Sequence, residues 1–214
     1  MFLNVSKFKK AVKKAYEGNG IHIMRLNDVY SFDAGWWFME VHKNNFTKGP
    51  MAAVIEIVGV LPDEEHGVYY RKNESPQEEL VEAYNIQLAE EVRKFKDQYS
   101  TTNVLFRTQK TMVEVLQHNN HKGHLLIPQS FLEMLDFGKV EPDECMFSFY
   151  GMTNEESNKI IWASDQMFIA SRKRPCRYYG EEHFMKNLNG VNLDWKWNED
   201  EVIPLVETPS CLSY

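Results

Sequence analysis

Two stretches of this chain carry the same short motifs in the same order, and that repetition limits the folds open to it. The stretches are residues 39–70 and residues 113–150 of the sequence. The offset between matching motifs grows slightly along the chain, so a few residues are inserted in the second copy. A repeat of this size predicts two related units, each with a strand, a turn, a short helix and a further strand. The matches are Glu40-Val41 with Glu114-Val115, Asn44-Asn45 with Asn119-Asn120, Lys48-Gly49 with Lys122-Gly123, Gly59 with Gly138, and Pro62-Asp63-Glu64 with Pro142-Asp143-Glu144.

The composition is that of a globular protein with an uneven charge distribution. An apolar content of 43% and a charged content of 26% exclude disorder as the default state. The net charge of −7 argues against a general nucleic-acid coat. However, residues 1–50 contain eight Lys and Arg against four acids, and residues 51–100 contain five against eleven. A basic face on an acidic body therefore stays open, because binding depends on the local field.

The cysteines and the apolar runs indicate a reduced, cytoplasmic protein. Cys145, Cys176 and Cys211 form no CxxC pair, so the sequence predicts neither a disulfide framework nor a zinc site. The longest apolar stretch, 51–61, is interrupted by Glu56, and the N-terminus lacks the apolar run of a signal peptide. We expect no cofactor, no metal and no membrane partner.

Hydrophobic periodicity predicts a mixed α+β fold. A capped amphipathic helix is expected over Val5–Glu17 and is terminated by Gly18-Asn19-Gly20. The strongest helix prediction covers residues 76–98, where apolar residues recur at a spacing of about 3.6. Shorter helices are expected over residues 50–58 and 129–135. Strands are expected at 21–26, 29–32, 36–42, 67–71, 104–107, 112–116, 145–150, 159–164 and 167–171.

We expect three parts along the chain: a first α+β unit over residues 1–74, a second over residues 75–176, and a C-terminal extension over residues 177–214. The extension contains Trp195 and Trp197 in strand-like alternation. It is interpreted either as an extra strand pair or as a partly mobile tail.

The span His124–Arg174 resembles the repeating unit of DNA polymerase sliding clamps, most closely the bacterial β clamp. In that unit a strand ending in Ile-Pro leads into a short Leu-rich helix and three strands, the last of which ends in Ser-Arg. The residues at the matching places are Ile127, Pro128, Phe131, Leu132, Leu135, Ile160, Ile161, Ile169, Ser171 and Arg172. The lysine-bearing first helix and the three strands after it are similar to the first half of such a unit.

This resemblance implies a ring around duplex DNA, basic helices that line its hole, and a replication or repair protein as a further partner. Bacterial clamps have three such units per chain, and this chain has at most two, so a six-unit ring would need a homo-oligomer of three copies. The helix expected over 76–98 carries Glu79, Glu82, Glu90 and Asp97. Carboxylates facing phosphate would repel it, which counts against a working clamp.

Two basic groups are the candidate DNA contacts. Lysines recur on one side of the first helix, and three cations follow the last predicted strand beside Arg177-Tyr178-Tyr179. Such side chains can bind phosphates without reading sequence, and mixed cations and aromatics are typical of single-strand binders. Ordinary solvated faces would give the same patterns. The candidate residues are Lys7, Lys10, Lys14, Arg172, Lys173 and Arg174.

The sequence carries no familiar catalytic signature, so we expect a non-enzymatic binding protein. The sequence has no Walker A loop, GxGxxG, HExxH or GxSxG motif. His118, His121 and His124 lie three apart, but no cysteine or nearby carboxylate completes a metal site, and their surroundings indicate a hairpin turn. Two alternatives stay open: a small acidic interaction or inhibitor protein, typical of mobile elements, that engages one protein partner, and a hydrolase with a dispersed site.

Overall fold

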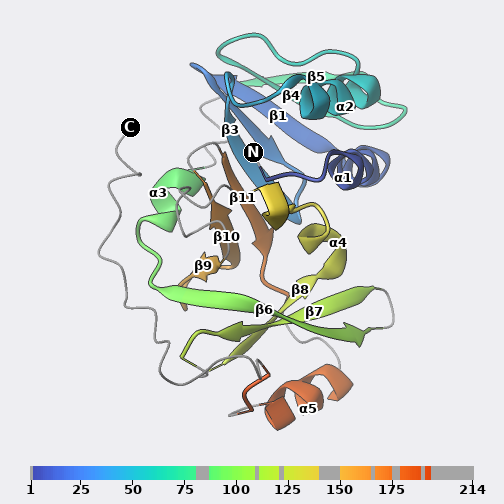
Figure 1. The fold of residues 1–214 in the computed structure, drawn as a ribbon. Helices are drawn as coiled ribbons and strands as arrows, with labels where there is room; N and C mark the ends of the chain where they lie inside the picture. Colours follow the sequence, from blue (N-terminus) through green and yellow to red (C-terminus); the bar gives the residue numbers. More distant parts are fainter. Residues whose placement is uncertain are drawn as a thin grey trace.

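One antiparallel sheet of eleven strands runs through the molecule (Figure 1). The strand order is β5-β4-β1-β2-β3-β11-β10-β9-β6-β7-β8. The computed structural model describes residues 2–80, 87–108, 111–120, 123–139, 150–164, 167–174, 179–188 and 191–193. The elements are α1 (Val5–Glu17), β1 (Ile21–Leu26), β2 (Val29–Asp33), β3 (Trp37–His42), α2 (Lys48–Val58), β4 (His66–Tyr70), β5 (Gln77–Leu80), α3 (Leu88–Val92), β6 (Asp97–Arg107), β7 (Met112–His118), β8 (His124–Pro128), α4 (Gln129–Leu132), β9 (Gly151–Thr153), β10 (Lys159–Ala163), β11 (Met167–Arg172) and α5 (Tyr179–Leu188).

The first helix and the strands after it follow directly from local sequence. Asn4 caps α1, because its side-chain oxygen accepts a hydrogen bond from the Lys7 backbone N–H at 3.3 Å. Phe8 and Val12 are fully buried beneath the helix. Gly18 ends α1, and its backbone N–H donates to the Ala15 carbonyl. The α+β class, the bounds of α1 and the positions of β1, β2 and β3 are thus confirmed.

Two parts of the sheet repeat each other about its centre, where β3 pairs antiparallel with β11. β3 and β11 have equal length, and so do β2 and β10. The first residues of β3 and β11 are as far apart in the sequence as the first residues of β2 and β10. The first residues of β1 and β9 have this same separation. The β2–β3 pairing of Val29 with His42 recurs as the pairing of Lys159 with Arg172. Two related antiparallel units therefore meet edge to edge in one sheet.

This relation replaces the residue pairing expected from the motifs. Glu40 lies in β3, but its expected counterpart Glu114 lies in β7, the neighbour of an edge strand. The Pro142-Asp143-Glu144 motif lies outside the described residues. The prediction of two related units was therefore right. The residue separation between the units that the motifs indicated was wrong, because it is shorter than the separation between the matching strands. Short polar motifs mark turns, which recur in any antiparallel sheet.

The helix expected over residues 76–98 was also wrong. Residues 77–80 form β5, which pairs antiparallel with β4. Among the described residues of this range, only Leu88–Val92 is α-helical, and β6 already begins at Asp97. The helical spacing was nevertheless informative, because Leu88, Val92 and Phe95 are all buried on one side. Since the long helix does not exist, the expected row of carboxylates along it does not exist either.

The helices cover both faces of the sheet. α1, α2 and α4 lie on one side and α3 lies on the other (Figure 1). The larger core lies under α1, α2 and α4 and includes Trp37, Trp162 and Phe131. A second cluster lies under α3. A third joins Phe184 and Met185 of α5 to β7 and β8, so part of the predicted C-terminal extension packs on the sheet.

Several expectations fall outside the described residues. They include the three cysteines, His121, residues 145–149 of the strand expected over 145–150, Arg177-Tyr178 and the two tryptophans near the C-terminus. The boundaries at residues 74 and 176 stay a prediction. Strands from both sides of residue 74 pair within one sheet.

Candidate nucleic-acid interface

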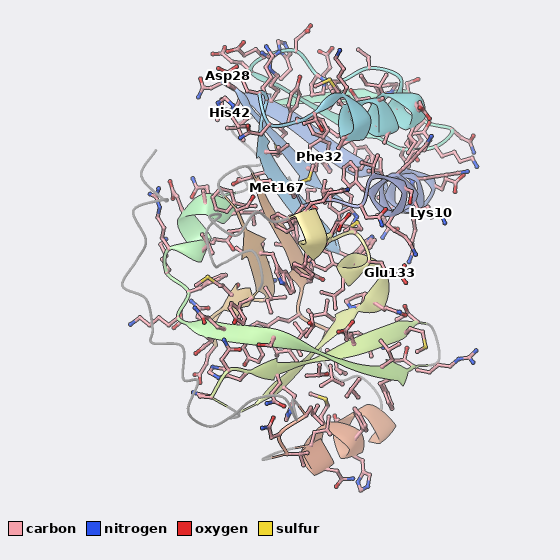
Figure 2. All side chains as sticks on the ribbon, in the orientation of Figure 1. Lys10, Asp28, Phe32, His42, Glu133 and Met167 are labelled. Atoms are coloured by element: carbon pink, nitrogen blue, oxygen red, sulfur yellow. The ribbon has the colours of Figure 1, made fainter. Side chains whose placement is uncertain are left out.

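The side of α1 that faces away from the sheet carries three exposed lysines: Lys10, Lys13 and Lys14. The helix presents them because its opposite side is occupied by the buried residues Phe8 and Val12. Figure 2 shows Lys10 projecting from α1 into solvent. Lys13 was missed from the sequence, although it lies three residues from Lys10 and so shares its face.

The lysines at the sides of α1 are held by carboxylates. Lys7 Nζ lies 2.7 Å from Glu133 Oε2, at the end of α4, and both side chains are about two-fifths exposed. Lys9 pairs with Glu56 of α2. These pairs tie α1 to its two neighbouring helices. They also neutralise two of its five lysines, including the predicted DNA contact Lys7.

Lys14 is positioned by an aromatic ring. Its Nζ lies 5.3 Å from the centroid of the Trp36 ring, within the range of a cation–π interaction. Trp36 follows the β2–β3 turn and packs against Trp37 at a steep angle. The side chain of Lys14 stays exposed in this arrangement. The contact orders the lysine and leaves its charge accessible to a phosphate.

The second predicted basic group does not join the first. Arg172 is exposed, and its guanidinium lies 5.4 Å from the ring centroid of Phe38, a residue of the cluster under α3. It therefore lies on the face of the sheet opposite α1. Lys173 and Arg174 are half-buried. Lys173 Nζ donates to the Asn154 carbonyl at 2.6 Å, and burial lowers the pKa of its amine.

Arg172 borders a groove of about 400 Å³ at one end of the sheet. Its lining mixes the cation with the imidazole of His22, the phenol of Tyr69 and the carboxylate of Asp33. The His22 and Tyr69 rings lie 4.6 Å apart, and Asp33 Oδ1 accepts a hydrogen bond from the Gly35 backbone N–H at 2.6 Å. The Asp33 carboxylate is thus used in its own turn, and the Tyr69 hydroxyl donates a hydrogen bond to the Asn19 carbonyl.

The histidines do not form a metal centre among the described residues. His118 Nδ1 accepts a hydrogen bond from the Asn120 backbone N–H at 3.1 Å, and its Nε2 lies 3.3 Å from Asp97 Oδ1. Both ring nitrogens are therefore engaged, which leaves neither for a metal or for general-base work. Within the described part of the chain, no three His, Cys, Asp or Glu side chains are grouped as a metal would require.

A buried carboxylate that the sequence did not single out lies under α3. Glu40 in β3 is only 7% exposed, and burial raises its pKa to about 7. Its Oε2 accepts a hydrogen bond from the Ala89 backbone N–H at 3.2 Å. β3 is buried on both faces, with Phe38, Met39 and Val41 around Glu40, so a single glutamate in this strand is buried with its apolar neighbours.

No protein-family model matches the chain, and no curated protein matches it in sequence. Among the helices of the described residues, none is both long and apolar enough to cross a membrane.

Solved structures of bacterial sliding clamps are similar to this chain, as the sequence resemblance predicted. The DNA polymerase sliding clamp of Bacillus subtilis is 11% identical, with a TM-score of 0.36, and the match covers 83% of this chain and 64% of the clamp. The DNA polymerase III beta chain of Streptococcus pneumoniae is 12% identical, with a TM-score of 0.31 and coverages of 86% and 67%. A putative DNA polymerase III beta subunit from Eubacterium rectale is 12% identical, with a TM-score of 0.35 and coverages of 84% and 65%. The resemblance is weak and partial, and this chain spans about two thirds of the length of those proteins.

Proposed function

We propose that this chain is a non-enzymatic, clamp-like DNA accessory factor that contacts the phosphate backbone of duplex DNA through the exposed lysines of α1. The observation that carries the proposal is the presence of Lys10, Lys13 and Lys14 together on the solvent side of one well-packed helix. A rigid row of cations suits sequence-independent phosphate binding. The net charge of −7 for the whole chain disfavours general binding of DNA over the surface and limits contact to local basic groups.

Arg172 is a second, separate contact in this proposal, on the opposite face of the sheet. Lys7, Lys173 and Arg174 contribute less, since the first is paired with Glu133 and the other two are half-buried. An ion pair or a buried amine must be released before it can meet a phosphate, and that release costs part of the binding energy.

The test is duplex binding across a salt series. The variant K10E/K13E/K14E removes the proposed face, and K43E/K94E/K96E is its matched control, because it makes the same charge change at exposed lysines outside α1. Each lost phosphate contact lowers the slope of log K against log salt by about 0.9, so the first variant should reduce the slope by roughly 2.7. Equal effects of the two variants, or no binding by the wild type, would contradict the proposal.

A ring around DNA would require association of this chain with itself. We expect three copies per ring, on the basis of the clamp resemblance. The mass in solution, measured by sedimentation equilibrium with and without duplex, separates a trimer from a monomer. If the chain is a monomer and binds DNA with the expected salt slope, the lysine contact is supported and the ring is contradicted.

One observation favours the alternative, a single protein partner. The end of α2 exposes apolar side chains, with Ile55 at 39% and Val60 at 65% exposure. Apolar residues on an acidic surface are typical of protein contacts. Capture of one cellular protein by the wild type, lost in I55S/V60S and kept in K10E/K13E/K14E, would support this function over DNA binding.

A further inference from the structure

α3 covers an apolar patch on the face of the sheet opposite α1. Leu88, Val92 and Phe95 are each at most 7% exposed. The patch beneath them comes from four strands and consists of Phe38, Met152, Ile161, Ala163, Phe168 and Ala170. The helix itself has only five residues. A single helical turn is too short to be stable alone, so α3 depends on this docking.

A carboxylate lies beneath the first turn of that helix. Glu40 is on the same side of β3 as Phe38, since residues two apart on a strand share a face. Its Oε2 accepts the hydrogen bond from the Ala89 backbone N–H. Across the sheet Glu40 pairs with Ser31 of β2 and Phe168 of β11, neither of which carries a charge. The carboxylate is thus held between a helix terminus and apolar rings.

Other charged groups reach this region from each neighbouring element. α3 contributes Glu90 and Glu91, and Lys159 of β10 contacts Glu91 Oε1 at 2.5 Å. Lys159 Nζ also lies 5.0 Å from the Phe38 ring centroid, and Arg172 of β11 lies over the same ring.

The strands beside Glu40 add two further titratable groups on this face, Asp33 of β2 and His42 of β3. Asp33 accepts a hydrogen bond from the Gly35 backbone N–H in its own turn. His42 Nδ1 accepts a hydrogen bond from the Asn44 backbone N–H at 3.3 Å. Both groups are thus engaged at strand ends. The backbone N–H groups of Ala89 and Leu88 reach the Glu40 carboxylate from α3, and they lower its pKa by less than burial raises it.

We propose that α3 is a pH-sensitive latch, closed over the apolar patch when Glu40 is protonated and released when Glu40 loses its proton. An ionised carboxylate among apolar side chains lacks the water that would stabilise it. Lifting α3 restores that water, so ionisation favours the open state. Opening would uncover Phe38, Ile161 and Phe168 of the apolar patch.

The direction of the pH dependence follows from the two states. The ordinary pKa of glutamate is 4.5, and in the closed state burial raises the pKa of Glu40 to about 7. The closed state therefore binds the proton more tightly. Its advantage is complete below pH 4.5 and is lost as the pH rises through about 7.

Hydrogen exchange on the full chain tests the latch. Protection factors, corrected for the intrinsic pH dependence of exchange, are measured for the amides of residues 89–95 between pH 5.5 and pH 8. We expect protection to fall roughly 10- to 50-fold over this range in the wild type. In E40Q it should stay at the low-pH value at every pH. E90Q, which removes an exposed charge from the same helix, should behave as the wild type.

Amides of β10, such as that of Ile161, separate the latch from general unfolding. Their protection should stay well above that of α3 at every pH, because they exchange only when the whole sheet unfolds. Equal protection of α3 and β10, constant protection of α3 in the wild type, or a pH dependence that persists in E40Q would each overturn the proposal. If E40Q does not fold, the side-chain carboxyl carbon of Glu40 is titrated by NMR in the wild type. A midpoint near 7 supports the latch, and one below about 5.5 overturns it.

Discussion

Phe38 of β3 and Phe168 of β11 are far apart in sequence and occupy equivalent positions in the two strands that meet at the centre of the sheet. Both side chains are buried in the cluster under α3. Because the strands pair antiparallel, the two phenylalanines are not directly opposite each other. Phe38 pairs with Ala170, and Phe168 pairs with Glu40. The repeat thus brings two large rings together under one short helix, and in one copy the neighbouring position is the titratable Glu40.

Glycine at position 20 should be required by both its backbone and its neighbour. Gly20 has a φ of +91°, and a Cβ there would collide with the ring of Tyr69, whose hydroxyl donates to the Asn19 carbonyl. Gly59 has the same φ with open space around it. We expect G59A to cost about 1 kcal/mol and G20A about 1–2 kcal/mol more. Urea unfolding measures both, and the excess should shrink in G20A/Y69A. If G20A and G59A lose the same free energy of unfolding, the ring of Tyr69 does not add to the cost at position 20.

The contact between α4 and the sheet should be a major source of stability. Phe131 and Trp162 are both fully buried, with ring centroids 5.3 Å apart. F131A removes a large ring and leaves a cavity, so we expect a loss of roughly 3–5 kcal/mol in the free energy of unfolding. L105A, at a leucine that is 46% exposed, should change it by less than about 0.5 kcal/mol. Chemical denaturation gives both values. Similar losses in the two variants would show that α4 is not anchored by this contact.

Removing Glu133 should strengthen DNA binding if α1 faces DNA. E133Q breaks the 2.7 Å pair with Lys7 and leaves that lysine free beside the exposed row. We expect the salt slope to rise by about 0.9, the value of one phosphate contact. The cost to stability should stay below about 1 kcal/mol, because both partners are partly exposed. E90Q, on the opposite side of the sheet, makes the same charge change and should leave DNA binding as it is. A weaker affinity in E133Q would contradict the proposed contact surface.

The stability of the whole chain should depend on pH through Glu40. The closed-state pKa of about 7 against an ordinary 4.5 means that folding takes up a proton between these values. The stabilisation present at pH 5 is therefore lost as the pH rises to 8, by up to roughly 2–3 kcal/mol. Denaturation of the wild type and E40Q at several pH values measures the difference. The free energy of unfolding of E40Q should rise relative to that of the wild type as the pH increases over this range. If the difference between the two proteins is constant, the pKa of Glu40 is not shifted in the folded protein.

Local chemistry was enough to predict much of the fold. Asn4, the apolar spacing through Val12 and the glycines after Glu17 give the bounds of α1. The alternation in residues 21–26 gives β1, and the α+β class follows from such segments. The exposed lysines of α1 were likewise predictable in kind, because a helix buried on one side must expose the other.

The failures have a common physical cause. The apolar spacing of Leu88, Val92 and Phe95 predicted a long helix, but residues 77–80 are strand because β4 offers an unpaired edge. The repeat was assigned to turn motifs, whereas the feature that the two units share is their strand pairing. Neither an open edge nor a strand register can be seen in a local window.

By itself the sequence determined that α1 is a helix with one apolar face and a row of lysines, and that short strands follow it. The tertiary structure alone decided that Lys7 is neutralised by Glu133, that Arg172 lies on the opposite face from α1, and that Glu40 is buried. The physical reason is distance along the chain. These three outcomes depend on contacts between residues far apart in sequence, and the field and solvation of a charged group are set by whatever the fold brings next to it.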